Sequence, residues 1–224
     1  MSIKKPEMIL FDLDGTLVDS VPDLSRCINQ MLEKLGLTRQ EEDRIRLWVG
    51  NGVSKLVSRS IYHSSGINPE PDQLDQALSI FDSLYFKNSH RYSTIYPGVI
   101  DFFNFLKTTN IKTGCVTNKA ERFTLPLLKK LKLDHFFETI ICGDTVARMK
   151  PDALPLLTAA KNMSILPEDS LMVGDSISDV NAAKHAGFDI VCVSYGYNHG
   201  VDISLAQPDA VIDSLIELKE IISW

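Results

Sequence analysis

Apolar residues in the second half of this chain gather in short runs that alternate with longer segments of helical spacing. A short buried run is typical of a strand, and apolar residues three and four apart are typical of a helix. Strands that alternate with helices indicate a parallel sheet covered by helices on both faces, a doubly wound α/β fold. The elements expected after residue 97 are helix 98–109, strand 112–116, helix 121–132, strand 139–142, helix 152–162, strand 171–173, helix 178–186, strand 190–193, strand 210–212 and a terminal helix 214–223.

The first part of the chain follows a different pattern. The apolar run from Met8 to Phe11 predicts one buried strand, but the following block, from 20 to 92, has helical spacing and no convincing strand. A helix is expected to begin at Ser20 as its N-cap, with Asp23 at capping-box spacing, and to end at Gly36. Three more are expected over 39–49, 52–63 and 71–91. We therefore expect an α/β core formed by residues 1–19 and 93–224, with residues 20–92 inserted as a helical cap.

Composition narrows the class of protein. Of the 224 residues, 44% are apolar and 23% are charged, which is ordinary for a globular protein. The formal net charge of −6 comes without a basic stripe, so nucleic acid is not an expected partner. No apolar run approaches membrane-spanning length, the amino terminus does not resemble a signal peptide, and the four cysteines are scattered. We expect a cytoplasmic protein with reduced, buried thiols and no membrane partner.

Two carboxylates follow the first strand, at Asp12 and Asp14, directly before Gly15. Ligands of parallel α/β sheets bind at the carboxyl ends of the strands. Two acids placed there repel each other, and a hard divalent cation such as Mg²⁺, which prefers oxygen ligands, would hold both ionised. Taken alone, however, Asp-x-Asp-Gly is more simply a turn that ends a strand.

Three later positions carry polar residues of the same kind. Thr117 and Asn118 follow strand 112–116, Lys150 precedes helix 152–162, and Asp175 and Asp179 follow strand 171–173. Most have an ordinary structural interpretation: a turn or cap for Thr117 and Asn118, a solvated lysine for Lys150, and an acid at a helix N-terminus for Asp179. Asp175 has no equally good one. Together they supply a nucleophile, a proton shuttle, a hydroxyl, a cation and further carboxylates, which phosphoryl transfer requires.

The four motifs, in this order, resemble those of the haloacid dehalogenase-like hydrolase superfamily, and the resemblance covers essentially the whole chain. Within the superfamily the chain is most similar to bacterial phosphoglycolate phosphatases. The resemblance implies a Rossmann-like core with an inserted helical cap, and Mg²⁺-dependent hydrolysis of a small phosphorylated acid, 2-phosphoglycolate in the first place. It rests on 12–16, 117–118, 150–151 and 174–179, and for the phosphoglycolate phosphatases on 48–52, 142–145 and 195–198.

The resemblance also implies a role for each site residue. Asp12 would be the nucleophile, and Asp14 the acid that protonates the leaving group and then activates water. Mg²⁺ would be held by Asp12, Asp175 and the backbone carbonyl of Asp14, with Asp179 as an outer or water-mediated partner. The phosphoryl group would be bound by Thr117, Asn118 and Lys150. The cap should select the substrate, and its loop Gly50, Asn51 and Gly52 is suited to bind it because glycines allow close backbone approach; a plain helix–helix turn is the open alternative.

Two alternatives stay open on the sequence. One is a sugar-phosphate phosphatase or phosphomutase of the same architecture. The other is a binding or regulatory relative that kept the fold and lost activity, since a fold alone does not fix function. The oligomeric state is also open.

Overall fold

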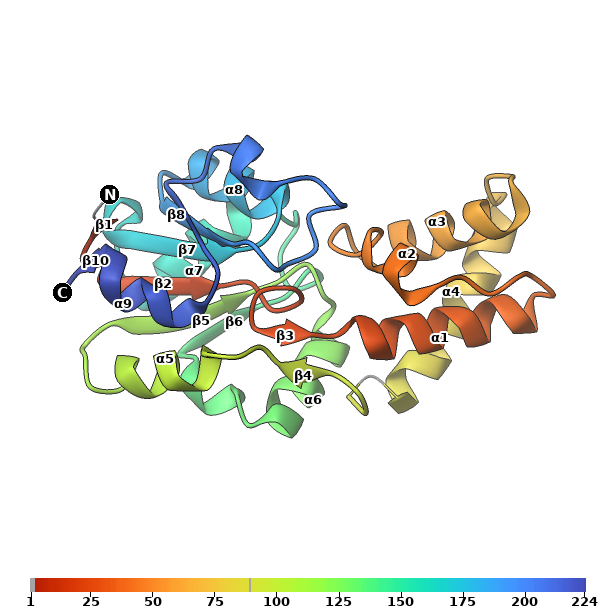
Figure 1. Ribbon diagram of the computed structural model, residues 1–224, viewed down its shortest axis with the longest axis horizontal. Coiled ribbons are helices and arrows are strands. Elements are labelled where there is room, and N and C mark those ends of the chain that lie inside the picture. Colours follow the sequence, from red (N-terminus) through yellow and green to blue (C-terminus); the bar gives the residue numbers. More distant parts are fainter. Residues whose placement is uncertain (1–2, 89) are drawn as a thin grey trace.

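The computed structural model describes residues 3–88 and 90–224 and contains a six-stranded sheet in the order β6-β5-β2-β7-β8-β9 (Figure 1). All its neighbouring strands pair in parallel. This confirms the expected doubly wound α/β core. The strands are β2 (Met8–Phe11), β5 (Lys112–Val116), β6 (Thr139–Ile141), β7 (Ser170–Gly174), β8 (Asp189–Val193) and β9 (Ala210–Ile212).

Strand β2 lies at the centre of the sheet, between β5 and β7. Its four residues are fully buried, because helices cover both faces of a parallel sheet, and this is why it is a continuous apolar run. Phe11, its last residue, lies opposite Cys115 of β5 and Val173 of β7. The carboxyl ends of the three strands are therefore nearly level, and the residues that follow them meet at one edge.

Each face of the sheet has its own helical layer (Figure 1). Ile9 and Phe11 of β2 belong to the same apolar cluster as residues of three helices, while Met8 and Leu10 belong to the cluster on the other face, with residues of two helices. The first layer is α5 (Val99–Leu106), α6 (Glu121–Leu131) and α9 (Leu218–Ile221); the second is α7 (Leu154–Met163) and α8 (Ile177–Ala186).

The helix expected over 214–223 is wrong in its length. The structure has a 3₁₀ turn over Leu215–Glu217, the one-turn helix α9, and then β10 (Ile222–Ser223), which pairs in parallel with β1 (Ile3–Lys4). Leu215, Leu218 and Ile222 are buried at helical spacing, but pairing with the first strand draws the last residues into an extended conformation.

Four helices lie to one side of the sheet, beyond the carboxyl end of β2 (Figure 1). They are α1 (Val21–Lys34), α2 (Glu42–Arg46), α3 (Val53–Ser65) and α4 (Pro71–Asn88), and they bury a third apolar cluster, to which the core adds Phe123 and Tyr197. The two connections to the core run side by side, because β3 (Val18–Asp19) pairs with β4 (Thr94–Ile95). These features support residues 20–92 as the cap, which stays a proposal. No described helix meets the length and hydropathy that a membrane crossing requires.

The capping box expected at the start of α1 is wrong. The Ser20 side chain makes no capping hydrogen bond. The Asp23 carboxylate is buried and instead accepts hydrogen bonds from the returning connection, from the backbone N–H of Tyr92 (3.1 Å) and of Ser93 (2.8 Å) and from the Ser93 hydroxyl (2.6 Å). A buried carboxylate with several donors is well satisfied, and Asp23 thereby joins α1 to the second connection. The helix expected over 39–49 is also too long, since only α2 forms there.

Candidate active site

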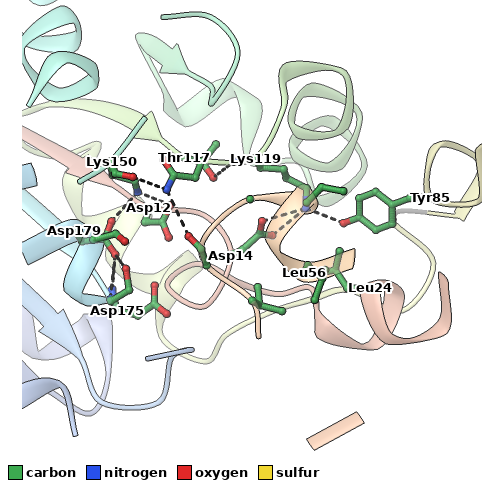
Figure 2. Close-up of a pocket in the computed structure, with 17 residues that line it drawn as sticks. Asp12, Asp14, Leu24, Leu56, Tyr85, Thr117, Lys119, Lys150, Asp175 and Asp179 are labelled. Carbon is green, nitrogen blue, oxygen red and sulfur yellow. Dashed lines mark hydrogen bonds and ion pairs between the residues drawn. The ribbon is translucent and has the colours of Figure 1, made fainter. Parts of the chain in front are cut away.

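The carboxyl ends of β2, β5 and β7 face the cap across a small cavity of about 60 Å³ (Figure 2). The core supplies its polar side and the cap supplies most of its apolar side. The lining residues are Asp12, Asp14, Thr117, Asn118, Lys119, Lys150, Asp175, Ser176, Ser178 and Asp179 from the core, and Leu24, Val49, Gly50, Gly52, Val53, Leu56 and Tyr85 from the 20–92 segment.

Three carboxylates converge at the core end of the cavity. Asp12, Asp175 and Asp179 are buried, and each offers an oxygen within 4.8 Å of the others. Burial, and then the neighbouring carboxylates, raise the pKa of Asp12 to about 6 although Lys150 opposes the shift, and the pKa of Asp175 is raised well above its usual range. Ionised carboxylates this close require positive charge, and their oxygens are the ligands that Mg²⁺ prefers. The cluster therefore fits a hard divalent cation.

Lys150 supplies a fixed positive charge beside this cluster. Its ammonium lies 2.8 Å from Asp12 Oδ1 and 2.7 Å from Asp179 Oδ1, and it donates to the Val116 carbonyl (2.7 Å). Burial alone would lower the pKa of Lys150, but Asp12 and Asp179 outweigh it and the pKa is raised. The alternative of a solvated surface lysine is wrong, because only 5% of Lys150 is exposed.

The Asp175 carboxylate is held from two sides. Thr16 donates its hydroxyl to Oδ1 (2.9 Å), and the backbone N–H of Tyr197 donates to Oδ2 (2.6 Å). Gly15 and Gly196 pack against the same carboxylate so closely that a Cβ at either position would clash with it. Two glycines far apart in the sequence are thus required by one side chain.

Asp179 orders the turn that carries Asp175. Its Oδ2 accepts hydrogen bonds from the backbone N–H of Asp175 (3.2 Å) and of Ser176 (3.0 Å) and from the Ser176 hydroxyl (2.7 Å). Its Oδ1 contacts Lys150. Both oxygens of Asp179 are therefore engaged, at the first turn of α8.

At the other end of the cavity, the Asp14 carboxylate faces a second buried lysine (Figure 2). Lys119 Nζ lies 3.1 and 3.2 Å from the two oxygens of Asp14 and donates to the Tyr85 hydroxyl (2.7 Å). Burial would lower the pKa of Lys119, but Asp14 and then Tyr85 outweigh it and the pKa is raised. Sequence reasoning missed both residues as site residues. Lys119 had a signal, its position next to Asn118, whereas nothing local to α4 marks Tyr85.

The expected phosphate-binding residues line the same cavity. The Thr117 hydroxyl accepts a hydrogen bond from the Lys119 backbone N–H (3.2 Å), and the Asn118 amide donates to the Lys150 carbonyl (3.0 Å). These contacts hold the loop after β5 against the loop that carries Lys150. Thr117, Asn118 and Lys150 are thus brought together, as the strand ends predict; their chemical roles stay predictions.

The cap loop divides into lining and supporting residues. Gly50 and Gly52 line the cavity with positive φ angles of 115° and 82°. Asn51 is not among the lining residues. Its side-chain oxygen accepts a hydrogen bond from Arg59 (2.8 Å), which also donates to the Trp48 carbonyl (2.8 Å). Asn51 therefore supports the loop from outside the cavity.

Known proteins resemble this chain in sequence and in fold. Residues 9–193 match the family described as haloacid dehalogenase-like hydrolase. A protein of Nitrosococcus oceani named phosphoglycolate phosphatase is 53% identical, over 99% of this chain and 98% of its own length. Phosphoglycolate phosphatase 1 of Pseudomonas aeruginosa is 44% identical, over 95% of this chain and 78% of its own length. A crystal structure described as a predicted phosphoglycolate phosphatase from Haemophilus somnus 129pt has a TM-score of 0.92 at 31% identity, covering 97% of this chain and 98% of that chain.

Proposed function

The chain belongs to the haloacid dehalogenase-like hydrolase family, and we propose that it hydrolyses 2-phosphoglycolate to glycolate and phosphate with the help of Mg²⁺. Its similarity to phosphoglycolate phosphatases over almost its whole length makes it a phosphoric monoester hydrolase. The observation that carries the finer proposal is that one cavity holds Asp14, the three-carboxylate cluster of Asp12, Asp175 and Asp179, and two buried lysines.

Mg²⁺ would be held by the side chains of Asp12 and Asp175 and by the backbone carbonyl of Asp14. The bound ion neutralises charge on the phosphoryl oxygens and on the carboxylates. Asp179 would remain an outer partner, because one of its oxygens pairs with Lys150 and the other accepts the N–H groups of the turn. In this arrangement Asp179 orients both Lys150 and the loop of Asp175.

The chemistry would run in two displacements at phosphorus, with Asp12 as the nucleophile of the first and the leaving group of the second. In the first, an Asp12 oxygen attacks phosphorus, the bond between phosphorus and the ester oxygen breaks, and the departing alkoxide takes a proton from Asp14. In the second, Asp14 takes a proton from water as that water attacks the aspartyl-phosphate, and phosphate leaves with Asp12 regenerated. The Thr117 hydroxyl, the Asn118 N–H and Lys150 would bind the transferring oxygens throughout.

A substrate panel tests the proposal. Purified protein is expected to release phosphate from 2-phosphoglycolate faster than from sugar phosphates, and to need added Mg²⁺. An isomerised phosphosugar seen by phosphorus NMR, in place of free phosphate, would identify a phosphomutase. No turnover on any ester, under conditions in which the protein is folded and Mg²⁺ is bound, would leave a binding or regulatory protein.

Mg²⁺ is expected to raise the midpoint of thermal unfolding more at about pH 8 than at about pH 5.5. Burial raises the pKa of Asp12 to about 6, above its value in the unfolded chain, so in the metal-free protein Asp12 contributes stability at low pH that is lost as the pH rises through about 6. The metal competes with that proton, and its stabilising effect grows as the carboxylate ionises. Differential scanning fluorimetry with and without MgCl₂ measures both effects. An equal shift at the two pH values, or an unchanged shift in Asp175→Asn, would contradict the assignment of the site.

Gly196→Ala is expected to lower kcat/KM by about 10²-fold or more while the fold is kept. The added methyl group would displace the Asp175 carboxylate. Displacement of a catalytic or metal-binding group by about 1 Å can lower the rate by this factor. Rates and the Mg²⁺-induced thermal shift should fall together. Gly36→Ala is the matched control: Gly36 has a positive φ of 70° but nothing near its missing Cβ, so this change should lower stability by about 1 kcal/mol and leave the rates unchanged.

A further inference from the structure

The cavity has two charged ends, and the proposed phosphoryl chemistry gives no role to Lys119, the cation at the end near the cap. Asp12, Asp175, Asp179 and Lys150 lie at the core end, whereas Lys119 and Tyr85 lie towards the cap, beside Leu24 and Leu56 (Figure 2). We propose that Lys119 binds the carboxylate of the substrate and thereby selects phosphorylated acids over neutral phosphate esters. The inference rests on the proposed function and adds a residue that determines its specificity.

Lys119 is the cation of the cavity with one carboxylate neighbour instead of two. Only two lysines and no arginine line the described cavity. The three N–H groups of Lys150 already meet Asp12, Asp179 and the Val116 carbonyl. Lys119 contacts one carboxylate, that of Asp14, and the Tyr85 hydroxyl. The two oxygens of Asp14 are almost equally distant from its ammonium. A second carboxylate on Lys119 would take over one of its two longer contacts with Asp14, at 3.1 and 3.2 Å, and the other would remain.

A second carboxylate on Lys119 would reproduce an arrangement that the site already contains. Lys150 lies between the carboxylates of Asp12 and Asp179, at 2.8 and 2.7 Å. Lys119 at present has one carboxylate neighbour, Asp14. A buried ammonium is stabilised by further hydrogen-bonded negative charge. The substrate carboxylate would therefore give Lys119 the second carboxylate neighbour that Lys150 already has within the protein.

The position of Lys119 fits an acid with one carbon between the ester oxygen and the carboxylate. Asp14 must lie within hydrogen-bonding distance of the ester oxygen to protonate it. Because Lys119 Nζ is 3.1 Å from Asp14, a carboxylate one methylene group beyond the ester oxygen reaches the ammonium. A longer acid would place its carboxylate further towards the apolar side chains of Leu24 and Leu56, where a charge has no partner.

Tyr85 acts here as a positioning residue. Its hydroxyl accepts from Lys119 at 2.7 Å, and its ring lies 4.9 Å from the same ammonium. Tyr85 belongs to α4, so the cap contributes to carboxylate selection by holding a lysine of the core in place.

The test compares two substrates that differ only at the proposed contact: 2-phosphoglycolate and 2-hydroxyethyl phosphate, in which a neutral hydroxymethyl group replaces the carboxylate. Lys119→Met is expected to lower the ratio of their kcat/KM values by roughly 10- to 100-fold, the range of a hydrogen bond to a charged group. The loss should fall mainly on KM for 2-phosphoglycolate. Lys119→Arg should keep part of the preference, and Lys55→Met, at an exposed position on α3, should leave the ratio unchanged.

The outcomes separate the two proposals. If the wild-type protein does not prefer 2-phosphoglycolate over its neutral analogue, the proposed function fails. If the wild type prefers it and Lys119→Met loses rate equally on both substrates, Lys119 acts through Asp14 alone and the inference is overturned. Should Lys119→Met not fold, Lys119→Gln, which keeps hydrogen bonds to Asp14 and Tyr85, takes its place with the same expected ratio. A ratio unchanged in folded Lys119→Gln overturns the inference as well.

Discussion

Asp12→Asn is expected to lower phosphate release from 2-phosphoglycolate by at least about 10³-fold, because the amide cannot attack phosphorus and no neighbouring group replaces it. Asp14 lies on the same loop, but its carboxylate is held by Lys119 towards the cap. A purified variant assayed by phosphate release, with deamidation excluded by mass spectrometry, gives the measurement. A rate within tenfold of the wild type would contradict the assignment of Asp12 as nucleophile.

The same variant should be at least as stable as the wild type when metal is absent. Burial raises the pKa of Asp12 to about 6, so the ionised carboxylate costs stability at neutral pH, and the neutral amide removes that cost. The gain, on the order of 3 kcal/mol, should shrink as the pH falls from about 7 towards 4, where the wild-type side chain is protonated. Chemical denaturation at these two pH values checks the sign. Asp101→Asn, at an exposed position of α5, is the control. It should leave the rate unchanged and alter the free energy of unfolding by no more than a few tenths of a kcal/mol.

The strands that the sequence predicted best are those buried on both faces. Strand β5 begins and ends where expected, and β2 is the run from Met8 to Phe11. A fully buried strand must be apolar throughout, and polar residues mark where it leaves the core. The two-residue pairs β1–β10 and β3–β4 were not predicted, because two residues carry no periodicity and their pairing depends on segments far apart in the chain.

The site was predicted where chemistry follows directly from a strand end. Asp12, Thr117 and Asp175 each come just after a central strand, so the register of the sheet alone brings them together. Residues held by tertiary contacts escaped prediction. Asp23 looked like half of a capping box and instead accepts hydrogen bonds from the second connection. Tyr85, which lies 34 residues before Lys119 in the chain, contacts it from α4.

Lys150 holds two buried carboxylates of the site, those of Asp12 and Asp179. Lys150→Met is expected to lower the free energy of unfolding by about 3–5 kcal/mol, because it leaves the buried carboxylates of Asp12 and Asp179 without their cation. It should also lower the hydrolysis rate by about 10²-fold or more, since the transferring phosphoryl group loses a fixed positive charge. Lys161→Met, at an exposed position near the end of α7, is the matched control and should stay within about 0.5 kcal/mol of the wild type.

A double-mutant cycle separates the charge from the packing of Lys150. Asp179→Asn in the Lys150→Met background removes one of the two carboxylates that the lysine leaves unpaired, so the double variant should be less destabilised than the sum of the single changes, by about 1–3 kcal/mol. Added Mg²⁺ should restore part of the stability of Lys150→Met, because the ion supplies positive charge to the same carboxylates. Strict additivity in the cycle would mean that Lys150 stabilises the site by filling space. The buried ion pair of Lys150 with Asp179, at 2.7 Å, predicts coupling, because removal of the lysine leaves the Asp179 carboxylate in an environment that cannot solvate it.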